Sequence, residues 1–162
     1  MFDKFIQIII DLEGGDLLHS HPNDPGGLTK FGISKKSFPQ VDIENLTYES
    51  ASRFYYHEFY LKYKLDKLYP SLSLCVLDAA INQGPGTAIR LLQRSVKAKE
   101  DGILGADTIK LCMDRANQDA LVQDFLCNRI LLYTKIGNFA IFGRGWIKRI
   151  LKIHEASMVF RI

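Results

Sequence analysis

The sequence has few cysteines and no pattern that would pair them. Its 162 residues include three cysteines, an odd number without CxxC spacing, and each lies in an apolar stretch with helical periodicity: Cys75, Cys112 and Cys127. A disulfide framework or a cysteine-rich metal site would need paired spacings. The pattern instead predicts buried free thiols in a protein made in a reducing compartment.

Long apolar runs and a strong charge of either sign are also missing. The first residues, MFDKFIQIII, are too short and too interrupted by charge for a signal peptide or a membrane span. We therefore expect synthesis in the cytoplasm without a signal peptide and no stable membrane anchor. The net charge of +3 is small, so it does not by itself indicate a nucleic-acid binder. No repeat or low-complexity linker divides the chain, which predicts one domain over residues 1–162.

The apolar periodicity is helical almost throughout. Residues 2–12 repeat apolar side chains at helical spacing until Gly14-Gly15, and Thr47 has the features of an N-cap for a helix beginning at residue 48. Further helices are predicted over 70–82, 86–97, 106–116, 118–136 and 144–158. No alternating run is long enough for a confident strand, although the loop 14–33 has room for a small hairpin. The sequence predicts a mainly α fold.

Glu13 stands where an apolar helix ends and a loop rich in Gly, Pro, Asn and Asp begins. A carboxylate in the last turn of a helix lies beside unpaired carbonyl groups, which disfavour its ionised form, as does shielding from water. A carboxyl group that stays protonated can act as a general acid. Gly14 and Gly15 leave space beside it for a substrate.

The loop supplies a second carboxylate in a different setting. Asp24 lies between Pro22 and Pro25 and is expected to stay ionised, and Thr29 follows five residues later, where it could help hold a water. Two carboxyl groups with different protonation states are what glycoside hydrolysis requires. A glutamate can also simply end a helix, and an aspartate can simply cap a turn, so spacing alone leaves that alternative open.

The segment from Glu13-Gly14-Gly15 to Asn23-Asp24-Pro25-Gly26-Gly27-Leu28-Thr29-Lys30-Phe31-Gly32-Ile33 resembles the signature of the glycoside hydrolase family 108 N-acetylmuramidases. The stretches LDAAINQGPGTAIRLLQRSV (77–96) and DGILGADTIKLC (101–112) are similar to the family's C-terminal segment, often described as a predicted peptidoglycan-binding domain. FGRGWIKRI (142–150) resembles its closing motif. The resemblance spans nearly the whole chain in three separate motifs.

This resemblance implies a lysozyme-like helical fold, with a catalytic lobe over 1–84 and a helical lobe over 85–162. It implies a peptidoglycan hydrolase that cleaves the β-1,4 bond after N-acetylmuramic acid, with Glu13 as general acid. In phage lysozymes, which the family resembles, Glu, Asp and Thr occur in this order, so Asp24 and Thr29 are expected to position or activate water. No cofactor is implied. Members occur as phage or prophage endolysins, and some relatives are labelled secretion activators.

The sequence departs from the family in the loop. Ten residues separate Glu13 from Asp24, where the family commonly has about eight, and Asp16 stands where an aromatic residue is common. Asp16 is therefore a rival second carboxylate. We retain Asp24 because its Pro-Gly-Gly context matches the family.

Four residues are candidates for binding sugar. Tyr60 belongs to a cluster with more aromatic side chains than one buried helix face needs. Asn82 and Gln83 are two amides before Gly84-Pro85-Gly86, and Trp146 is the single tryptophan. Aromatic faces stack on sugar rings, but Tyr60 and Trp146 can equally belong to the core. His19 and His21 lie two apart without a third ligand of clear spacing, so no metal site is expected.

Two other functions remain open. One is a catalytically silent cell-wall-binding or secretion-related protein on the same fold, against which Glu13, Asp24 and Thr29 are all present. The other is a small helical nucleic-acid binder, which is suggested only by the basic residues near the C-terminus. These residues are more simply explained as the solvated face of the last helix.

The expected partner is the glycan strand of peptidoglycan. We expect the protein to act as a monomer in the periplasm or cell wall, which it would reach through a holin or another export route.

Overall fold

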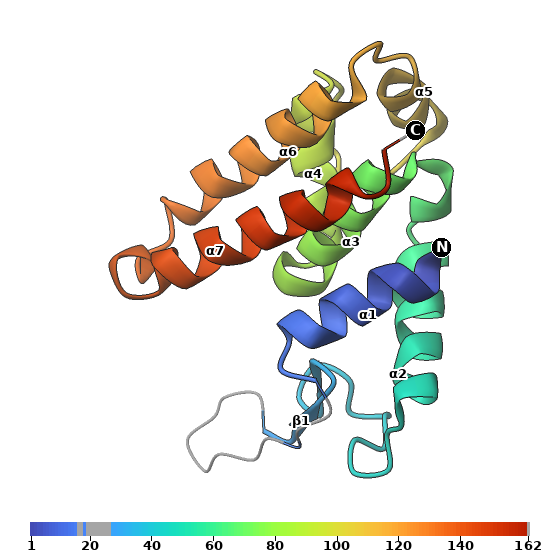
Figure 1. Ribbon diagram of the computed structural model, residues 1–162, viewed down its shortest axis with the longest axis vertical. Coiled ribbons are helices and arrows are strands. Elements are labelled where there is room, and N and C mark those ends of the chain that lie inside the picture. The colour runs from blue at the N-terminus through green and yellow to red at the C-terminus, as the bar shows by residue number, and fades with distance from the viewer. Residues whose placement is uncertain (16–17, 19–26, 162) are drawn as a thin grey trace. The chain divides into compact units, whose positions relative to one another are not determined.

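The computed structural model describes residues 1–15, 18 and 27–161 (Figure 1). It is mainly α-helical, with a small antiparallel pair of strands, and so confirms the predicted fold class. The chain divides into two compact units, Met1–His57 and Glu58–Ile162. The predicted lobe boundary after residue 84 falls between two helices of the second unit, and the division into lobes 1–84 and 85–162 stays a prediction.

The first unit begins with α1 (Phe2–Leu12), whose apolar side chains recur every three or four residues along one buried face: Phe2, Phe5, Ile6, Ile9 and Ile10. The helix ends as predicted. Glu13 is its C-cap, and Gly14 and Gly15 follow with φ of 97° and 73°. The N–H of Gly15 donates to the carbonyl oxygen of Ile10 at 3.0 Å, which satisfies one of the last carbonyl groups of the helix.

A two-residue turn joins β1 (Thr29–Lys30) to β2 (Ile33–Ser34), with Thr29 opposite Ser34 and Lys30 opposite Ile33. Both turn residues, Phe31 and Gly32, have positive φ (53° and 78°). Positive φ at both central positions is typical of the tight turn that matches the twist of a hairpin. The predicted hairpin is therefore confirmed.

The second helix of this unit is α2 (Tyr48–Tyr55), which continues as a π-helix over Tyr56–Leu61. Thr47 caps it as predicted. The Ser50 N–H donates to Thr47 Oγ1 at 3.2 Å, and the Thr47 N–H donates to Ser50 Oγ at 2.9 Å. This reciprocal capping box satisfies two backbone donors that would otherwise have no partner.

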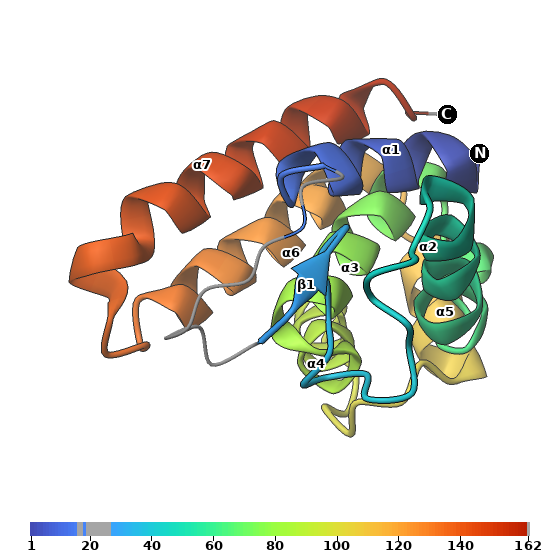
Figure 2. The same ribbon diagram turned by 90° about the horizontal axis from the view of Figure 1, so that it is seen from below.

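The second unit contains a short 3₁₀-helix, Leu65–Lys67, and five α-helices: α3 (Pro70–Gln83), α4 (Pro85–Ser95), α5 (Ala106–Met113), α6 (Gln118–Tyr133) and α7 (Phe139–Met158). Helix α3 is buried continuously over residues 71–80 because α4, α6 and α7 all pack against it. Figures 1 and 2 show α6 and α7 side by side and antiparallel. A helix that is apolar on every side is the expected centre of such a bundle.

The last helix begins at Phe139 rather than at the predicted residue 144. Glycine lowers intrinsic helix propensity, but here it has a packing role. A Cβ on Gly143 would lie 2.6 Å from the Phe139 ring, so the absence of a side chain lets that ring lie against the helix. The predicted start at residue 144 was therefore five residues too late.

The cysteines only partly match the prediction. Cys75 and Cys112 are buried free thiols, and burial raises the pKa of each to about 12, which keeps them in the unreactive thiol form. Cys127 is exposed, so the prediction was wrong there. It lies on the solvent face of α6, with exposed Gln123 and Leu131 one turn before and after it.

Candidate functional site

Glu13 is the C-cap of α1 and is half-buried. Its backbone N–H donates to the carbonyl oxygens of Ile9 and Ile10 at 3.0 and 3.1 Å. The backbone of Glu13 is therefore fixed by helical hydrogen bonds, and the chain leaves the helical conformation at Gly14. This placement agrees with the helix end expected from Gly14-Gly15.

The hairpin turn packs directly onto Glu13. A Cβ on Gly32 would lie 2.9 Å from Glu13 Cγ and 2.9 Å from Tyr55 Oη. Tyr55 is almost fully buried, and its hydroxyl donates to the Phe31 carbonyl oxygen at 2.9 Å. Helix α2 thus holds the turn in place, and the turn lies against the aliphatic part of the Glu13 side chain. Only glycine leaves enough room at this position.

Thr29 belongs to the same hairpin, half-buried at the start of β1, where its hydroxyl donates to the Gly27 carbonyl oxygen at 3.3 Å. The structure therefore brings Glu13 into contact with the element that carries Thr29. Asp24 and its rival Asp16 lie outside the described residues, as do His19 and His21. Their predicted roles, and those of Glu13 and Thr29, stay predictions.

Gly32→Ala should lower both stability and activity. At φ of 78° an L side chain is strained by about 1–2 kcal/mol, and the new methyl group would also displace Glu13 Cγ or the hydrogen-bonded Tyr55 hydroxyl. Gly27→Ala is the matched control, because Gly27 has φ of 66° but nothing within 4 Å of its Cβ position. Thermal unfolding should show a loss for both variants, and glycan cleavage should fall further in Gly32→Ala. Equal activity of the two variants would contradict the positioning of Glu13 by the turn.

The residues predicted to bind sugar all lie in the second unit. Tyr60 is half-buried in the π-helix. Asn82 is exposed near the end of α3, where its amide donates to the Asp78 carbonyl oxygen at 3.2 Å, and Gln83 is the last residue of that helix. Trp146 is half-buried on α7 and stacks on Tyr133 with 4.9 Å between ring centroids. This stacking gives Trp146 a packing role, and its sugar-binding role stays a prediction.

Sequence reasoning missed a buried charge cluster beside Gln83. Asp78 Oδ2 accepts from Arg129 Nη1 at 2.5 Å, and Asp78 Oδ1 accepts from Arg149 Nε and Nη2 at 2.9 and 2.6 Å. The side chains of Asp78 and Arg129 are fully buried. One sequence signal was available: Asp78 is a lone carboxylate inside the apolar run LSLCVLDAAI. Such a residue is almost never buried without a partner.

The DGILG motif forms a loop held by its own unit. The buried Gln93 amide donates to Asp101 Oδ1 at 2.7 Å and to the Ile103 carbonyl oxygen at 3.1 Å, and its Oε1 accepts from the Gly102 N–H at 2.9 Å. Asp101 Oδ1 also accepts from the Ile103 N–H at 2.9 Å. These bonds engage Asp101 and Gly102 in shaping the loop itself.

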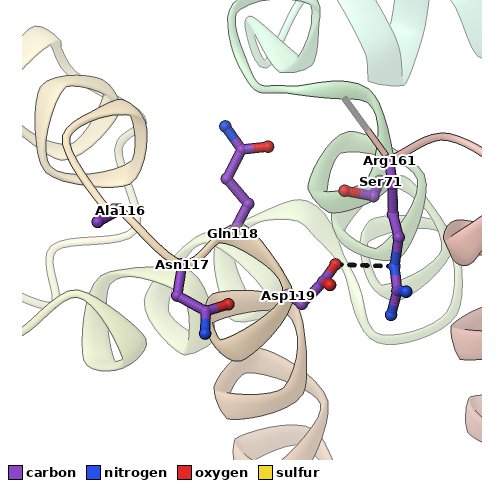
Figure 3. Close-up of a pocket in the computed structure, with 6 residues that line it drawn as sticks. All are labelled: Ser71, Ala116, Asn117, Gln118, Asp119 and Arg161. Atoms are coloured by element: carbon purple, nitrogen blue, oxygen red, sulfur yellow. Dashed lines mark ion pairs between the residues drawn. The ribbon is translucent and has the colours of Figure 1, made fainter.

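A polar cavity of about 430 Å³ lies in the second unit, lined by residues around the starts of α3 and α6 and by one residue after α7: Ser71, Ala116, Asn117, Gln118, Asp119 and Arg161 (Figure 3). Arg161 Nε and Asp119 Oδ1 form an ion pair at 2.9 Å across it. None of the residues predicted from the sequence lines this cavity.

Among the described residues, no helix is long and apolar enough to cross a membrane.

Comparison with known families identifies the N-terminal half. Residues 6–84 match the family model described as Glycosyl hydrolase 108. The glycosyl hydrolase 108 region contains α1 from residue 6 onward, the hairpin, α2 and α3, and with them six of the seven predicted site residues: Glu13, Asp24, Thr29, Tyr60, Asn82 and Gln83. Trp146 lies outside it.

A solved structure resembles the chain over nearly its whole length. SagA of Brucella abortus shares 28% sequence identity and superposes with a TM-score of 0.87, covering 98% of this chain and 94% of SagA. SagA is a secretion activator protein, which agrees with the predicted secretion-activator relatives, and the prediction of a lysozyme-like fold is confirmed. No relative was found among the curated proteins. The glycosyl hydrolase 108 region supports a glycoside hydrolase of the peptidoglycan-cleaving kind.

Proposed function

We propose that the protein is an N-acetylmuramidase that cleaves the β-1,4 bond between N-acetylmuramic acid and N-acetylglucosamine in peptidoglycan. One observation carries the proposal: within the glycosyl hydrolase 108 region, Glu13 ends α1 and lies against the hairpin turn at Gly32. A half-buried carboxyl group held by packing can deliver a proton to a fixed point. Glu13 is the general acid that protonates the leaving oxygen.

Asp24 and Thr29 activate and hold the attacking water. The two routes of glycoside hydrolysis differ in the separation of the carboxyl groups, which is about 5–5.5 Å for direct attack by a carboxylate and roughly 6.5–9.5 Å where a water lies between them. Since Thr29 follows Asp24 in the chain and offers a hydroxyl, the pair suits a water rather than direct attack. The reaction then inverts the anomeric configuration, which NMR of the first products measures. A retained configuration would exclude the water-holding role.

The choice of second carboxylate has a direct test. Asp24→Asn should impair hydrolysis more than Asp16→Asn, because loss of the base removes water activation, worth about a hundred- to ten-thousand-fold in rate. Initial rates on purified peptidoglycan measure both variants, and thermal unfolding checks that both fold. The reverse order of activities would assign the base to Asp16.

Digestion of purified peptidoglycan tests the reaction itself. New reducing ends at N-acetylmuramic acid, identified by mass spectrometry, are the expected result. Ends at N-acetylglucosamine would mean a glucosaminidase, and anhydro-muramic products would mean a lytic transglycosylase.

The protein acts as a monomer on glycan strands in the periplasm or cell wall. It reaches them from the cytoplasm through a holin or another export route.

A second function is favoured by the similarity to SagA, a secretion activator protein. In this alternative the protein serves secretion by binding the cell wall without cleaving it. Sedimentation with purified peptidoglycan in the absence of any released muropeptide would support it. Cleavage under the same conditions would exclude a purely binding role.

A further inference from the structure

The orientation of the Gln83 side-chain amide is fixed by a partner that can only donate. Arg129 Nε lies 2.6 Å from Gln83 Oε1. A guanidinium group has five N–H donors and no acceptor, so the amide must present its oxygen to Arg129. A flipped amide would place two donors against each other. The Nε2 group of Gln83 therefore points away from Arg129.

Arg129 is itself held rigidly. Its side chain is fully buried, Nη1 donates to Asp78 Oδ2 at 2.5 Å, and Nη2 donates to the Tyr133 hydroxyl at 3.3 Å. Asp78 is in turn anchored through its other oxygen by Arg149. A continuous chain of hydrogen bonds thus runs from Asp78 on α3 through Arg129 on α6 to Gln83 at the end of α3. Networks of this kind restrict the positions of their members.

The fixed Gln83 Nε2 group is unusual in its surroundings. It is the one buried side-chain nitrogen or oxygen without a hydrogen-bond partner among the residues that the structure describes. Buried polar groups in native proteins are nearly always paired. The residue as a whole is only half-buried, and Gly84, which follows with φ of 85°, has nothing within 4 Å of its Cβ position. The residue that carries this buried donor therefore reaches the surface in part, and the residue after it borders open space.

We propose that Gln83 Nε2 donates a hydrogen bond to the acetamido carbonyl oxygen of an N-acetylated sugar, and that Arg129 and Asp78 are positioning residues for this contact. The inference rests on the proposed muramidase function and assigns its substrate contact to one atom. An amide N–H and an amide carbonyl are a matched donor and acceptor. An acceptor from outside the protein completes the hydrogen bonding of a group that its own unit leaves unpaired. Arg129 and Asp78 act only through Gln83 and do not touch the sugar.

Gln83→Glu tests the Nε2 donor most directly. It keeps the shape and the acceptor for Arg129, but it replaces the N–H donor with an oxygen that repels a carbonyl. Calorimetry with N-acetylglucosamine oligomers should show affinity about tenfold or more below wild type, with no fall in melting temperature, because the new carboxylate pairs with Arg129. On peptidoglycan, KM should rise while kcat changes little, as expected for a lost ground-state contact.

Gln118→Glu is the matched control. It makes the same chemical change at the first residue of α6, eleven residues before Arg129, which is about 16 Å along the helix. Its affinity and KM should match wild type. Oligomers of glucosamine, which lack the acetyl group, form the second control. Wild type should bind them more weakly than the acetylated oligomers, and Gln83→Glu should make little further difference.

Arg129→Lys tests the positioning role. Lysine keeps the charge beside Asp78 but lacks the planar fork that reaches Asp78 and Gln83 together. Affinity for the acetylated oligomers should fall severalfold, and the double variant with Gln83→Glu should bind no more weakly than Gln83→Glu alone, because both changes act on one contact. Additive losses in the double variant would overturn the positioning role. If Arg129→Lys fails to fold, Gln83→Glu still decides the donor.

The outcomes separate the inference from the function on which it rests. A wild-type protein that neither binds the oligomers nor cleaves peptidoglycan overturns both. A wild type that cleaves peptidoglycan, with Gln83→Glu equal to it in affinity and KM, overturns the Gln83 contact alone. Equal effects of Gln83→Glu on acetylated and deacetylated oligomers would overturn the assignment to the acetamido carbonyl.

Discussion

Replacing Glu13 by glutamine should reduce the rate of peptidoglycan cleavage by about a hundred- to ten-thousand-fold, the usual contribution of a general acid. Glutamine keeps the size and shape of the side chain but has no proton to donate to the leaving oxygen. The packing of Gly32 against Cβ and Cγ is unchanged, because those atoms are common to both residues. Release of reducing ends from purified peptidoglycan measures the rate, and thermal unfolding checks the fold.

Asp11→Asn provides the control for this variant. Asp11 belongs to the same last turn of α1, is exposed, and accepts a hydrogen bond from the exposed Gln7 amide at 2.9 Å. Its replacement also removes one negative charge near the end of the helix, but from the solvent face. Activity close to wild type is expected. A Glu13→Gln protein that retains most of its rate would remove Glu13 from the role of acid, and equal losses in both variants would indicate an effect of net charge.

The features predicted correctly are those set by local chemistry. The end of α1 follows from Gly14-Gly15 after an apolar helix, and the N-cap at Thr47 follows from a side-chain oxygen placed before a helical run. Both depend on residues within four positions of each other. The place of Glu13 at the end of α1 could be predicted for the same reason.

The features that were missed depend on contacts between distant residues. Asp78 pairs with Arg129 and Arg149, 51 and 71 positions later in the chain, and no periodicity in the sequence connects them. The early start of α7 is the exception, because the Phe139 ring lies over Gly143 only four positions later, a packing contact that helix propensity does not describe. The exposure of Cys127 depends on which face of α6 meets the bundle. Each outcome is decided by packing rather than by local preference.

The candidate site combines both kinds of information. The motif predicted the types of residue around Glu13, but the contact between Glu13 and Gly32 joins α1 to a turn nineteen residues later. The Phe31-Gly32 turn needs positive φ, which glycine tolerates, and the same glycine leaves room for the glutamate. A sequence shows that a glycine is present, whereas only the fold shows which side chain it admits.

Asp78→Asn should destabilise the second unit more than any other single change considered above. Asp78 accepts hydrogen bonds from Arg129 and Arg149. Replacing its carboxylate with a neutral amide leaves these two cations without a negative charge between them, and Arg129 is fully buried. Removing one partner from a buried ion pair typically costs about 3–5 kcal/mol, because the remaining charge has lost its solvation without compensation. For a chain of this length, roughly 2–4 °C of melting temperature are lost per kcal/mol, so a fall of about 10 °C is expected.

Glu100→Gln gives the matched comparison. Glu100 also pairs with an arginine through two hydrogen bonds, with Arg94 Nη2 at 2.6 Å and Arg94 Nε at 2.9 Å, but both side chains are substantially exposed. Water screens such a pair, so its loss should cost far less stability than the loss of the Asp78 charge. Urea and thermal unfolding of the two variants measure the difference. Equal losses would show that burial of the Asp78 cluster adds nothing to its contribution, whereas a loss confined to Asp78→Asn would identify this cluster as the charged centre that holds α3, α6 and α7 together.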